Sequence, residues 1–480
     1  MLNNPIIQRY RYSLLRPSHF LVYVAIYISV VVLLLFFNYT LYKYQETFRT
    51  PEDLCKGIYY QFLAFQIIVL WFWGAFNSAS AIKEEITGKT YDFFRMLPLA
   101  ARQKTIGILL GKNLVVLLLG AISCLFLVFF GSFGGISFNL QVQILLVLLS
   151  ITILVNSIAL LSSINLTQKA KKTNVFVFIL FAFFFAPFFL MRALGSLSET
   201  EKLEKVIARF FEIKLPVLIL VSLIALYFSC WAIKGTLRRF TREDEPLFTR
   251  KGAFLFMLGF EVVLLGLFYH YIRKEEIEVS YSYWTISLLA VFAVPLGALR
   301  NFDKYLEYSG LIREKSASKL NITRRILLHS NISLVLGLFI IWSAGSLVTI
   351  LISRMELFTG LYRIWVLFSF YIFFMLLLEL NILYKPLSPK IVHLLFFIAG
   401  VYVIFPLILS AILESEIIYL YSPLGFFWEI MYESQRSTPS LISTPLVLTG
   451  VWVVNALLCA IPILLIKKRY SDILILRQKM

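Results

Sequence analysis

The chain has 480 residues, of which 60% are hydrophobic and 15% are charged, and its formal net charge is +18. No polar stretch between the apolar blocks exceeds about thirty residues, which is too few for a folded soluble domain and argues against soluble catalysis by this chain alone. The basic residues occupy short segments between apolar blocks. Membrane topology and anionic lipid headgroups account for them there, so nucleic acid is not an expected partner.

The apolar blocks are about twenty residues long, the length of helix that crosses roughly 30 Å of hydrocarbon. They predict an all-α polytopic membrane protein with about twelve transmembrane helices. The predicted spans lie near residues 20–37, 58–80, 113–131, 140–164, 175–191, 215–233, 253–271, 280–299, 327–352, 362–383, 391–412 and 446–466.

The distribution of Lys and Arg sets the direction of these spans. With the N-terminus in the cytoplasm, about two thirds of the 45 basic residues fall in cytoplasmic segments, the asymmetry that the positive-inside rule describes. We therefore expect both the N- and C-termini in the cytoplasm and the protein in the plasma (inner) membrane. The charged segment 192–214 then lies outside, and we expect it to form a short helix on the outer surface.

An even number of spans suggests two six-helix halves, because transporter folds often arise from internal repeats. The first half would cover residues 1–240 and the second residues 250–480, with Thr241–Thr249 as the joint. Each half would carry a long basic cytoplasmic segment between its second and third spans, 81–112 in the first and 300–326 in the second. This match in position is the main support for a duplication.

The N-terminal segment, Met1–Arg16, predicts an amphipathic helix at the membrane surface. Its apolar side would face the lipid, and its basic side would face the headgroups and the cytosol. The apolar positions are Ile6, Ile7, Tyr10, Leu14 and Leu15, and the basic positions are Arg9, Arg11 and Arg16.

The segment 81–98 follows the second predicted span and separates apolar from charged positions at helical spacing. The apolar positions are Ile82, Ile86, Phe93, Phe94 and Leu97, and the charged positions are Lys83, Glu84, Glu85, Lys89, Asp92 and Arg95. Gly88 interrupts the pattern, so we expect two short helical pieces along the cytoplasmic membrane surface. Such a surface suits the docking of a soluble partner. An amphipathic loop that only tethers two spans fits the same pattern.

The order of residues in this segment resembles the cytoplasmic loop of ABC-2 type permeases, the membrane subunits of ATP-driven exporters. The matching positions are Glu84 and Glu85, Gly88 with Thr90, Asp92, Phe93 with Phe94, Pro98, and Gly111 with Lys112, while Lys89 separates the glycine from the threonine. Near the end of the chain, Ser422–Phe427 resembles the Asn-Pro-Leu-aromatic pattern before the last span of the family. The resemblance covers residues 1–235 and 413–466, so the second half would be a degenerate permease unit.

The resemblance implies a permease subunit that exports a lipid-like, peptide or drug-like molecule. A separate nucleotide-binding (ATPase) subunit would bind ATP and Mg²⁺, and a second copy of this chain or another permease subunit would complete the pathway if one chain does not. The ATPase subunit would dock on residues 81–112, which we call the coupling segment. The docking residues would be Glu84, Glu85, Gly88, Lys89, Asp92, Phe93, Phe94 and Pro98.

Within the chain itself we expect no enzymatic activity and no catalytic, metal-binding or cofactor-binding residues. The four cysteines lie far apart without a CxxC pair. The nearest approach to a phosphate loop, Gly107–Asn113, is one residue short and has Asn where Ser or Thr would bind magnesium. We expect Lys112 in this stretch to reach the lipid headgroups.

Three other functions fit parts of the sequence. An ion-coupled secondary transporter would need a carboxylate inside the membrane, and Glu261 and Glu379 lie within predicted spans. A lipid-modifying enzyme would need clustered catalytic groups, and the sequence has no HExxH motif and no paired Asp motif. A structural membrane subunit that transports nothing would have the same composition.

Overall fold

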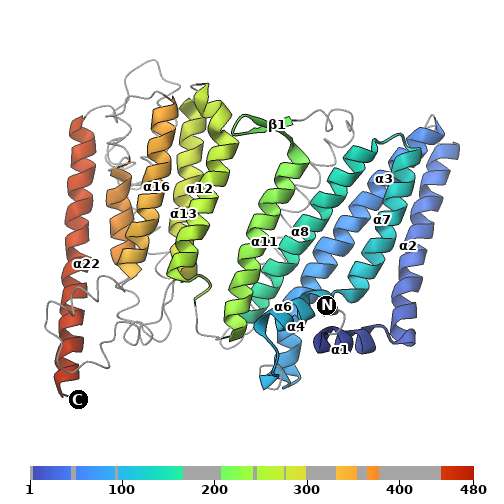
Figure 1. Ribbon diagram of the computed structural model, residues 1–480, viewed down its shortest axis with the longest axis horizontal. Helices are drawn as coiled ribbons and strands as arrows, with labels where there is room; N and C mark the ends of the chain where they lie inside the picture. The colour runs from blue at the N-terminus through green and yellow to red at the C-terminus, as the bar shows by residue number, and fades with distance from the viewer. Residues whose placement is uncertain are drawn as a thin grey trace, which may run out of the picture. The chain divides into compact units, whose positions relative to one another are not determined.

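Figure 1 shows the computed structural model of the chain. It describes residues 4–44, 50–91, 96–165, 207–241, 246–274, 277–298, 331–353, 364, 366–377 and 445–479. In these residues, eight helices are long and apolar enough to cross a membrane: Pro17–Lys43, Pro51–Thr87, Leu114–Phe133, Phe138–Ile164, Val217–Thr241, Arg250–Arg273, Leu334–Ser353 and Thr449–Ile466. The chain is therefore a mostly helical, multi-pass membrane protein.

Each of these eight helices overlaps a predicted span. Two further predicted spans, 280–299 and 362–383, overlap the shorter apolar helices Ser282–Val291 and Val366–Leu377. The predicted spans 175–191 and 391–412 lie outside the described residues. The total of about twelve spans and the cytoplasmic position of both termini therefore stay predictions.

The chain divides into two compact units. The first unit comprises Met1–Ala208 and Lys214–Leu247, and the second comprises Arg209–Ile213 and Phe248–Met480. The boundary between Leu247 and Phe248 falls within the predicted joint, Thr241–Thr249. The proposal that both units descend from one six-helix repeat stays a prediction.

The first unit is built from eight α-helices and one π-helical segment in the part that the structure describes. They are α1 (Pro5–Leu14), α2 (Pro17–Tyr44), α3 (Pro51–Ile67), η1 (Ile68–Trp73), α4 (Gly74–Thr87), α6 (Ala101–Lys112), α7 (Leu114–Phe133), α8 (Phe138–Asn165) and α11 (Val217–Thr241). Its core packs Tyr59 and Phe62 of α3 against Leu119 of α7 and Leu140 of α8. Large apolar side chains along α2, such as Leu33, stay more than half exposed, as expected for a surface in contact with lipid tails.

The second predicted span belongs to one continuous rod formed by α3, η1 and α4. Thr50 begins it with a capping box, in which its hydroxyl accepts from the Asp53 N–H at 3.1 Å and the Asp53 carboxylate accepts from the Thr50 N–H at 3.2 Å. The rod ends at Gly88, whose N–H donates to the Glu84 carbonyl at 2.8 Å. The prediction of a separate surface helix beginning near residue 81 is wrong, because Ala81, Ile82 and Glu85 are buried and continue the inward face of the span.

The N-terminal helix α1 lies across the lower ends of the neighbouring spans in Figure 1, as expected for a helix parallel to the membrane surface. The prediction that Ile6, Ile7 and Tyr10 face lipid is wrong, because all three side chains are buried. Ile6 and Tyr10 pack on α6, where a Cβ atom added to Gly107 would lie 2.8 Å from Ile6 and one added to Gly111 would lie 2.6 Å from Tyr10. Glycines four residues apart let two helices approach this closely.

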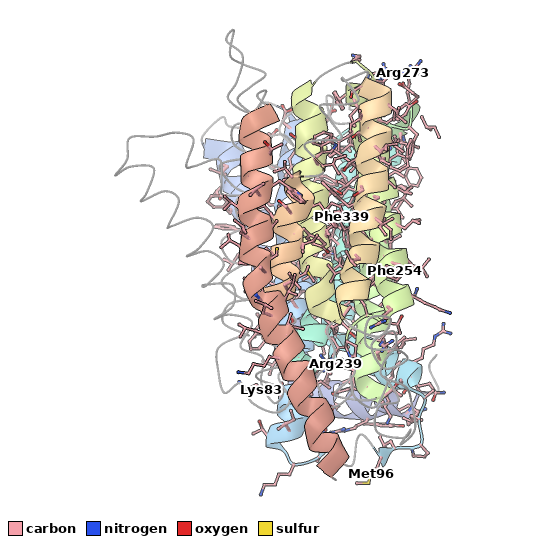
Figure 2. All side chains as sticks on the ribbon, turned by 90° about the vertical axis from the view of Figure 1, so that its left-hand side faces the viewer. Lys83, Met96, Arg239, Phe254, Arg273 and Phe339 are labelled. Atoms are coloured by element: carbon pink, nitrogen blue, oxygen red, sulfur yellow. The ribbon has the colours of Figure 1, made fainter. Side chains whose placement is uncertain are left out.

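The second unit packs α12 (Arg250–Arg273), α13 (Ile277–Ala298), α16 (Asn331–Ser353), Val366–Leu377 and α22 (Pro445–Lys479) around one apolar core. Phe254 of α12 fills the space left by Gly337 of α16, where a Cβ atom would lie 2.6 Å from its ring. Figure 2 shows Phe254 and Phe339 along the length of these helices and Arg273 at one end. The second unit is therefore held mainly by aromatic and aliphatic contacts.

Residues 207–216 form a two-stranded hairpin, β1 (Ile207–Phe210) and β2 (Ile213–Pro216). The prediction of a surface helix over 192–214 is therefore wrong for its last residues, while 192–206 lie outside the described residues. The turn residues Phe211 and Glu212 have φ values of 48° and 67°, a conformation incompatible with a continuing right-handed helix. The Phe211 N–H donates to the Gly266 carbonyl of α12 at 3.1 Å, and this contact orients the turn.

We expect the substitution Gly111→Ala to destabilise the protein by about 1–3 kcal/mol, because its methyl group would collide with the Tyr10 ring. Thermal unfolding of the purified full chain in detergent measures this effect. Gly235→Ala in α11 is the matched control, since its new Cβ atom would have its nearest neighbour, Leu161, at an ordinary 3.4 Å. Equal melting temperatures for the two variants would contradict the close packing of α1 on α6.

We expect acid to loosen the hairpin turn. The hydrogen bond with His270, together with the charges of His270, Arg273 and Arg209, lowers the pKa of Glu212 below its usual value. A carboxyl group of this kind contributes stability above its ordinary pKa and loses that contribution as the pH falls through its lowered folded-state pKa. Hydrogen exchange at the Phe211 amide, corrected for intrinsic rate, should accelerate with acid in the wild type and lose this dependence in Glu212→Gln. The same pH dependence in both proteins would exclude Glu212 as its source.

Candidate functional site

The predicted coupling segment lies at one end of the first unit, where α1, α4 and α6 meet. We call this region the corner and define it as residues Pro5–Leu14, Ala81–Tyr91 and Ala101–Lys112. Figure 2 shows Lys83 near this end of the first unit, together with Met96 and Arg239. The Asn4 side chain caps the first turn of α1 by accepting from the Ile6 N–H at 3.0 Å, and its amide donates to the Gln103 carbonyl of α6 at 2.7 Å. A single side chain thus begins one helix of the corner and joins it to another.

Glu85 is an internal residue of the corner. Its side chain is only 7% exposed, and its carboxylate forms an ion pair with Arg9 of α1 at 3.0 Å. The Thr90 hydroxyl donates to the same carboxylate at 2.6 Å. Because Thr90 follows the turn at the end of α4, this network fixes both the turn and the position of α1.

A second ion pair joins the end of α4 to α6. Lys112 pairs with Glu84, and the Lys112 side chain is 13% exposed whereas that of Glu84 is 57% exposed. The Lys112 ammonium also lies 6.0 Å from the centre of the Tyr10 ring. The expectation that Lys112 reaches the headgroups is therefore wrong, because the end of the α3–η1–α4 rod brings a carboxylate within reach of it.

Tyr10 lies between these two ion pairs. Burial, followed by the nearby charge of Glu85, raises the pKa of its hydroxyl group well above the usual value. The phenol is therefore neutral at physiological pH and serves as packing between α1 and α6. The close approach of charges and an aromatic ring makes the corner a rigid element rather than a flexible loop.

The tip of the corner, residues 83–90, is exposed apart from Glu85. The chain reverses there because Lys89, with a φ of 54°, adopts the left-handed conformation next to Gly88, whose φ is −75°. The sequence pattern attributed the interruption of the helix to Gly88, but the residue in the strained left-handed conformation is Lys89. Lys89 therefore projects from the turn as an exposed cation.

The remaining predicted site residues fall into two groups. Pro98, Arg11 and Arg16 are exposed, and so is Arg9 on the side away from Glu85. Asp92, Phe93 and Phe94 lie outside the described residues, and the expected second helical piece lies there with them. The expected Gly-Lys match, Gly111 with Lys112, lies inside the corner.

Sequence reasoning missed the contacts that join α1 to the rest of the corner. Arg9 was expected to face headgroups, Thr90 was only a motif position, and Asn4 was not considered. One available signal was the four-residue spacing of Gly107 and Gly111, which is typical of close helix packing. The matching spacing of Ile6 and Tyr10 supplies the opposing surface.

The π-helical segment η1 interrupts the rod between the corner and its far half. Gln66 lies just before it and donates to the Gly120 carbonyl of α7 at 2.8 Å. Gly74 lies just after it, and a Cβ atom there would lie 2.9 Å from the Asn156 side chain of α8. Short π-helical segments occur frequently at functional sites in proteins, so η1 is a candidate for a hinge within the rod.

We expect the Arg9–Glu85 pair to couple α1 to α4. Arg9→Gln leaves the buried Glu85 carboxylate without its cation, which should cost about 1–3 kcal/mol of stability. In a double-mutant cycle with Glu85→Gln, the double variant should lose at least about 0.5 kcal/mol less than the sum of the two single losses. Arg11→Gln, at an exposed position of the same helix, should change stability by less than about 0.5 kcal/mol. Strict additivity of the two single variants would show that the pair contributes nothing.

No protein-family model matches this chain, and no curated protein and no solved structure is significantly similar to it. The ABC-2 resemblance therefore remains an expectation carried by the residues of the coupling segment and the chain ends. What the structure establishes is an integral, multi-pass, mostly helical membrane protein with eight candidate spans in its described residues.

Proposed function

We propose that this chain is the permease subunit of an ABC-2 type ABC transporter in the plasma membrane. It would export a lipid-like, peptide or drug-like molecule, driven by ATP hydrolysis on a separate nucleotide-binding subunit that also holds Mg²⁺. The observation that carries the proposal is the continuity of the rod Pro51–Thr87, which ends in the exposed charged tip. A partner that pushed on the tip would act directly on a membrane span.

The corner supplies the means of transmitting such a push. The Arg9–Glu85 and Lys112–Glu84 pairs link the end of the rod to α1 and α6. Because Gly111 has no side chain, the Tyr10 ring packs directly against α6. Closely packed elements move as rigid bodies instead of deforming smoothly. Displacement of the tip would therefore move α1 and α6 together with the rod, and η1 would absorb the change in direction.

The structure of α6 supports placing the ATP site on another subunit. The stretch from Gly107 to Lys112, the nearest approach to a phosphate loop, is helical. Its two glycines are covered by Ile6 and Tyr10 of α1, and its lysine is paired with Glu84. A phosphate group would have to displace all three contacts to bind there.

Affinity purification of the tagged chain in mild detergent, followed by identification of co-purifying proteins and an ATPase assay, tests the proposal. A stoichiometric nucleotide-binding subunit should accompany the wild type. The double variant Lys83→Glu with Lys89→Glu should lose this subunit, because both cations lie on the exposed tip and their reversal should leave the folded corner intact.

Lys274→Glu is the matched control, since Lys274 is an exposed cation at the end of α12 on the predicted outer side. It should retain the ATPase subunit. A chain that purifies alone and without ATPase activity, under conditions that preserve known transporter complexes, would exclude the proposal. An ion-coupled transporter in vesicles would then take up its substrate only when an ion gradient is present. A structural subunit would show no such uptake.

A further inference from the structure

One carboxylic acid lies in the middle of a membrane span of the second unit. Glu261 occupies the centre of α12, which runs from Arg250 to Arg273, and its residue surface is only 4% exposed. A carboxylate at this depth is costly unless a cation or several donors compensate its charge. The surroundings of Glu261 therefore decide its protonation state.

Two neutral hydroxyl groups from α13 contact the carboxyl group of Glu261. Tyr283 donates to one of its oxygens and Ser287 donates to the other. The two donors are four residues apart and so share one face of α13. Tyr283 is the titratable side chain on that face. The whole residue is 0% exposed, so its hydroxyl group is buried.

The third wall of the site is α16. A Cβ atom at Gly345 would lie 3.1 Å from a carboxyl oxygen of Glu261 and 2.5 Å from the Tyr283 hydroxyl oxygen. The absence of a side chain at Gly345 thus leaves room for the carboxyl group against the helix backbone. This face of α16 therefore contributes no charged group to the contact.

A second observation shows unused hydrogen-bonding capacity on the same face of α16. Trp342 precedes Gly345 by three residues and is fully buried, so both lie on one side of the helix. Its indole N–H has no acceptor among the described residues. The side of α16 that faces Glu261 therefore carries a buried donor but no charged group.

We propose that Glu261 is a proton-binding site of the second unit, and that the contact between α12, α13 and α16 closes around the protonated acid. Among the described residues, Glu261 forms no ion pair, and its partners Tyr283 and Ser287 are neutral. The protonated carboxyl group accepts from Tyr283 and donates to the Ser287 oxygen. The Ser287 hydroxyl then turns to the carbonyl four residues earlier in its own helix, a common acceptor for serine.

The proton exchanges with water. Water at the membrane surface supplies it when the three helices close, and water accepts it when they separate and the carboxylate becomes hydrated. Closure therefore takes up one proton at neutral pH, so a rise in pH favours separation of the helices. This inference does not depend on an ATPase partner. It would hold for an ABC-2 type permease and equally for an ion-coupled transporter.

Infrared spectroscopy of the purified full chain in lipid nanodiscs tests the site directly. The carbonyl stretching band of a protonated carboxylic acid should be present at pH 7, shift in D₂O, and disappear in Glu261→Gln. Glu52→Gln is the control, because the Glu52 side chain is 58% exposed at the start of α3, and it should leave the band unchanged. Absence of the band from the wild type at pH 7, or its persistence in Glu261→Gln, would overturn the proposal.

The variant Tyr283→Phe provides a second test that does not depend on folding of Glu261→Gln. It removes a donor that stabilises the ionised carboxylate more than the neutral acid, so the infrared band should persist to higher pH than in the wild type. Thermal unfolding should accompany this shift: the melting temperature of the wild type should fall as the pH rises from the ordinary pKa of a glutamate to the midpoint of the band and level off above it. In Tyr283→Phe the fall should continue to a higher pH before it levels off. An unchanged or downward shift of the band midpoint would contradict the contact between Tyr283 and a protonated Glu261.

Discussion

Backbone hydrogen bonding in a solvent without water is the constraint on which the remaining structure depends. An unpaired peptide N–H or C=O group in hydrocarbon costs several kcal/mol, so an apolar segment that crosses a bilayer must satisfy these groups within itself. The described spans do so as helices. The same requirement acts on polar side chains, and it makes Gln66 of α3 donate to a backbone carbonyl of α7. Buried polar groups therefore specify which spans touch and in which register.

The corner shows how the chain builds a rigid charged element at the end of such a bundle. Glycines in α6 bring α1 into direct contact, and this approach places Arg9 within reach of the buried Glu85. Removing either charge would leave the other poorly compensated, because a partly buried ion pair is stable only while both partners remain. The helix α1 thus contributes to the fold through its apolar face and to the ionic network through one arginine.

The two units place their polar side chains differently. The described part of the first unit carries its charge pairs at the end of a span, where a soluble protein can reach the adjoining tip. The second unit encloses a carboxyl group at mid-span between α12, α13 and α16. Under the two proposals, the first unit responds to a partner protein and the second responds to protons. Either response would act on packed helices, which shift between discrete arrangements.

The sequence by itself determined the class of protein and the position of most described spans, because runs of about twenty apolar residues have few stable alternatives in a bilayer. It also placed a helix interruption at Gly88 and an acidic residue, Glu261, at mid-span, although it ended the second span near residue 80. Only the tertiary structure decided that Ile6 and Tyr10 face α6 instead of lipid, that Lys112 pairs with Glu84, and that residues 207–216 form a hairpin. An apolar helix face is equally compatible with lipid and with a neighbouring helix, and a charged side chain pairs with whatever group the fold brings near it. Those choices depend on contacts between segments distant in sequence, which periodicity along one segment does not contain.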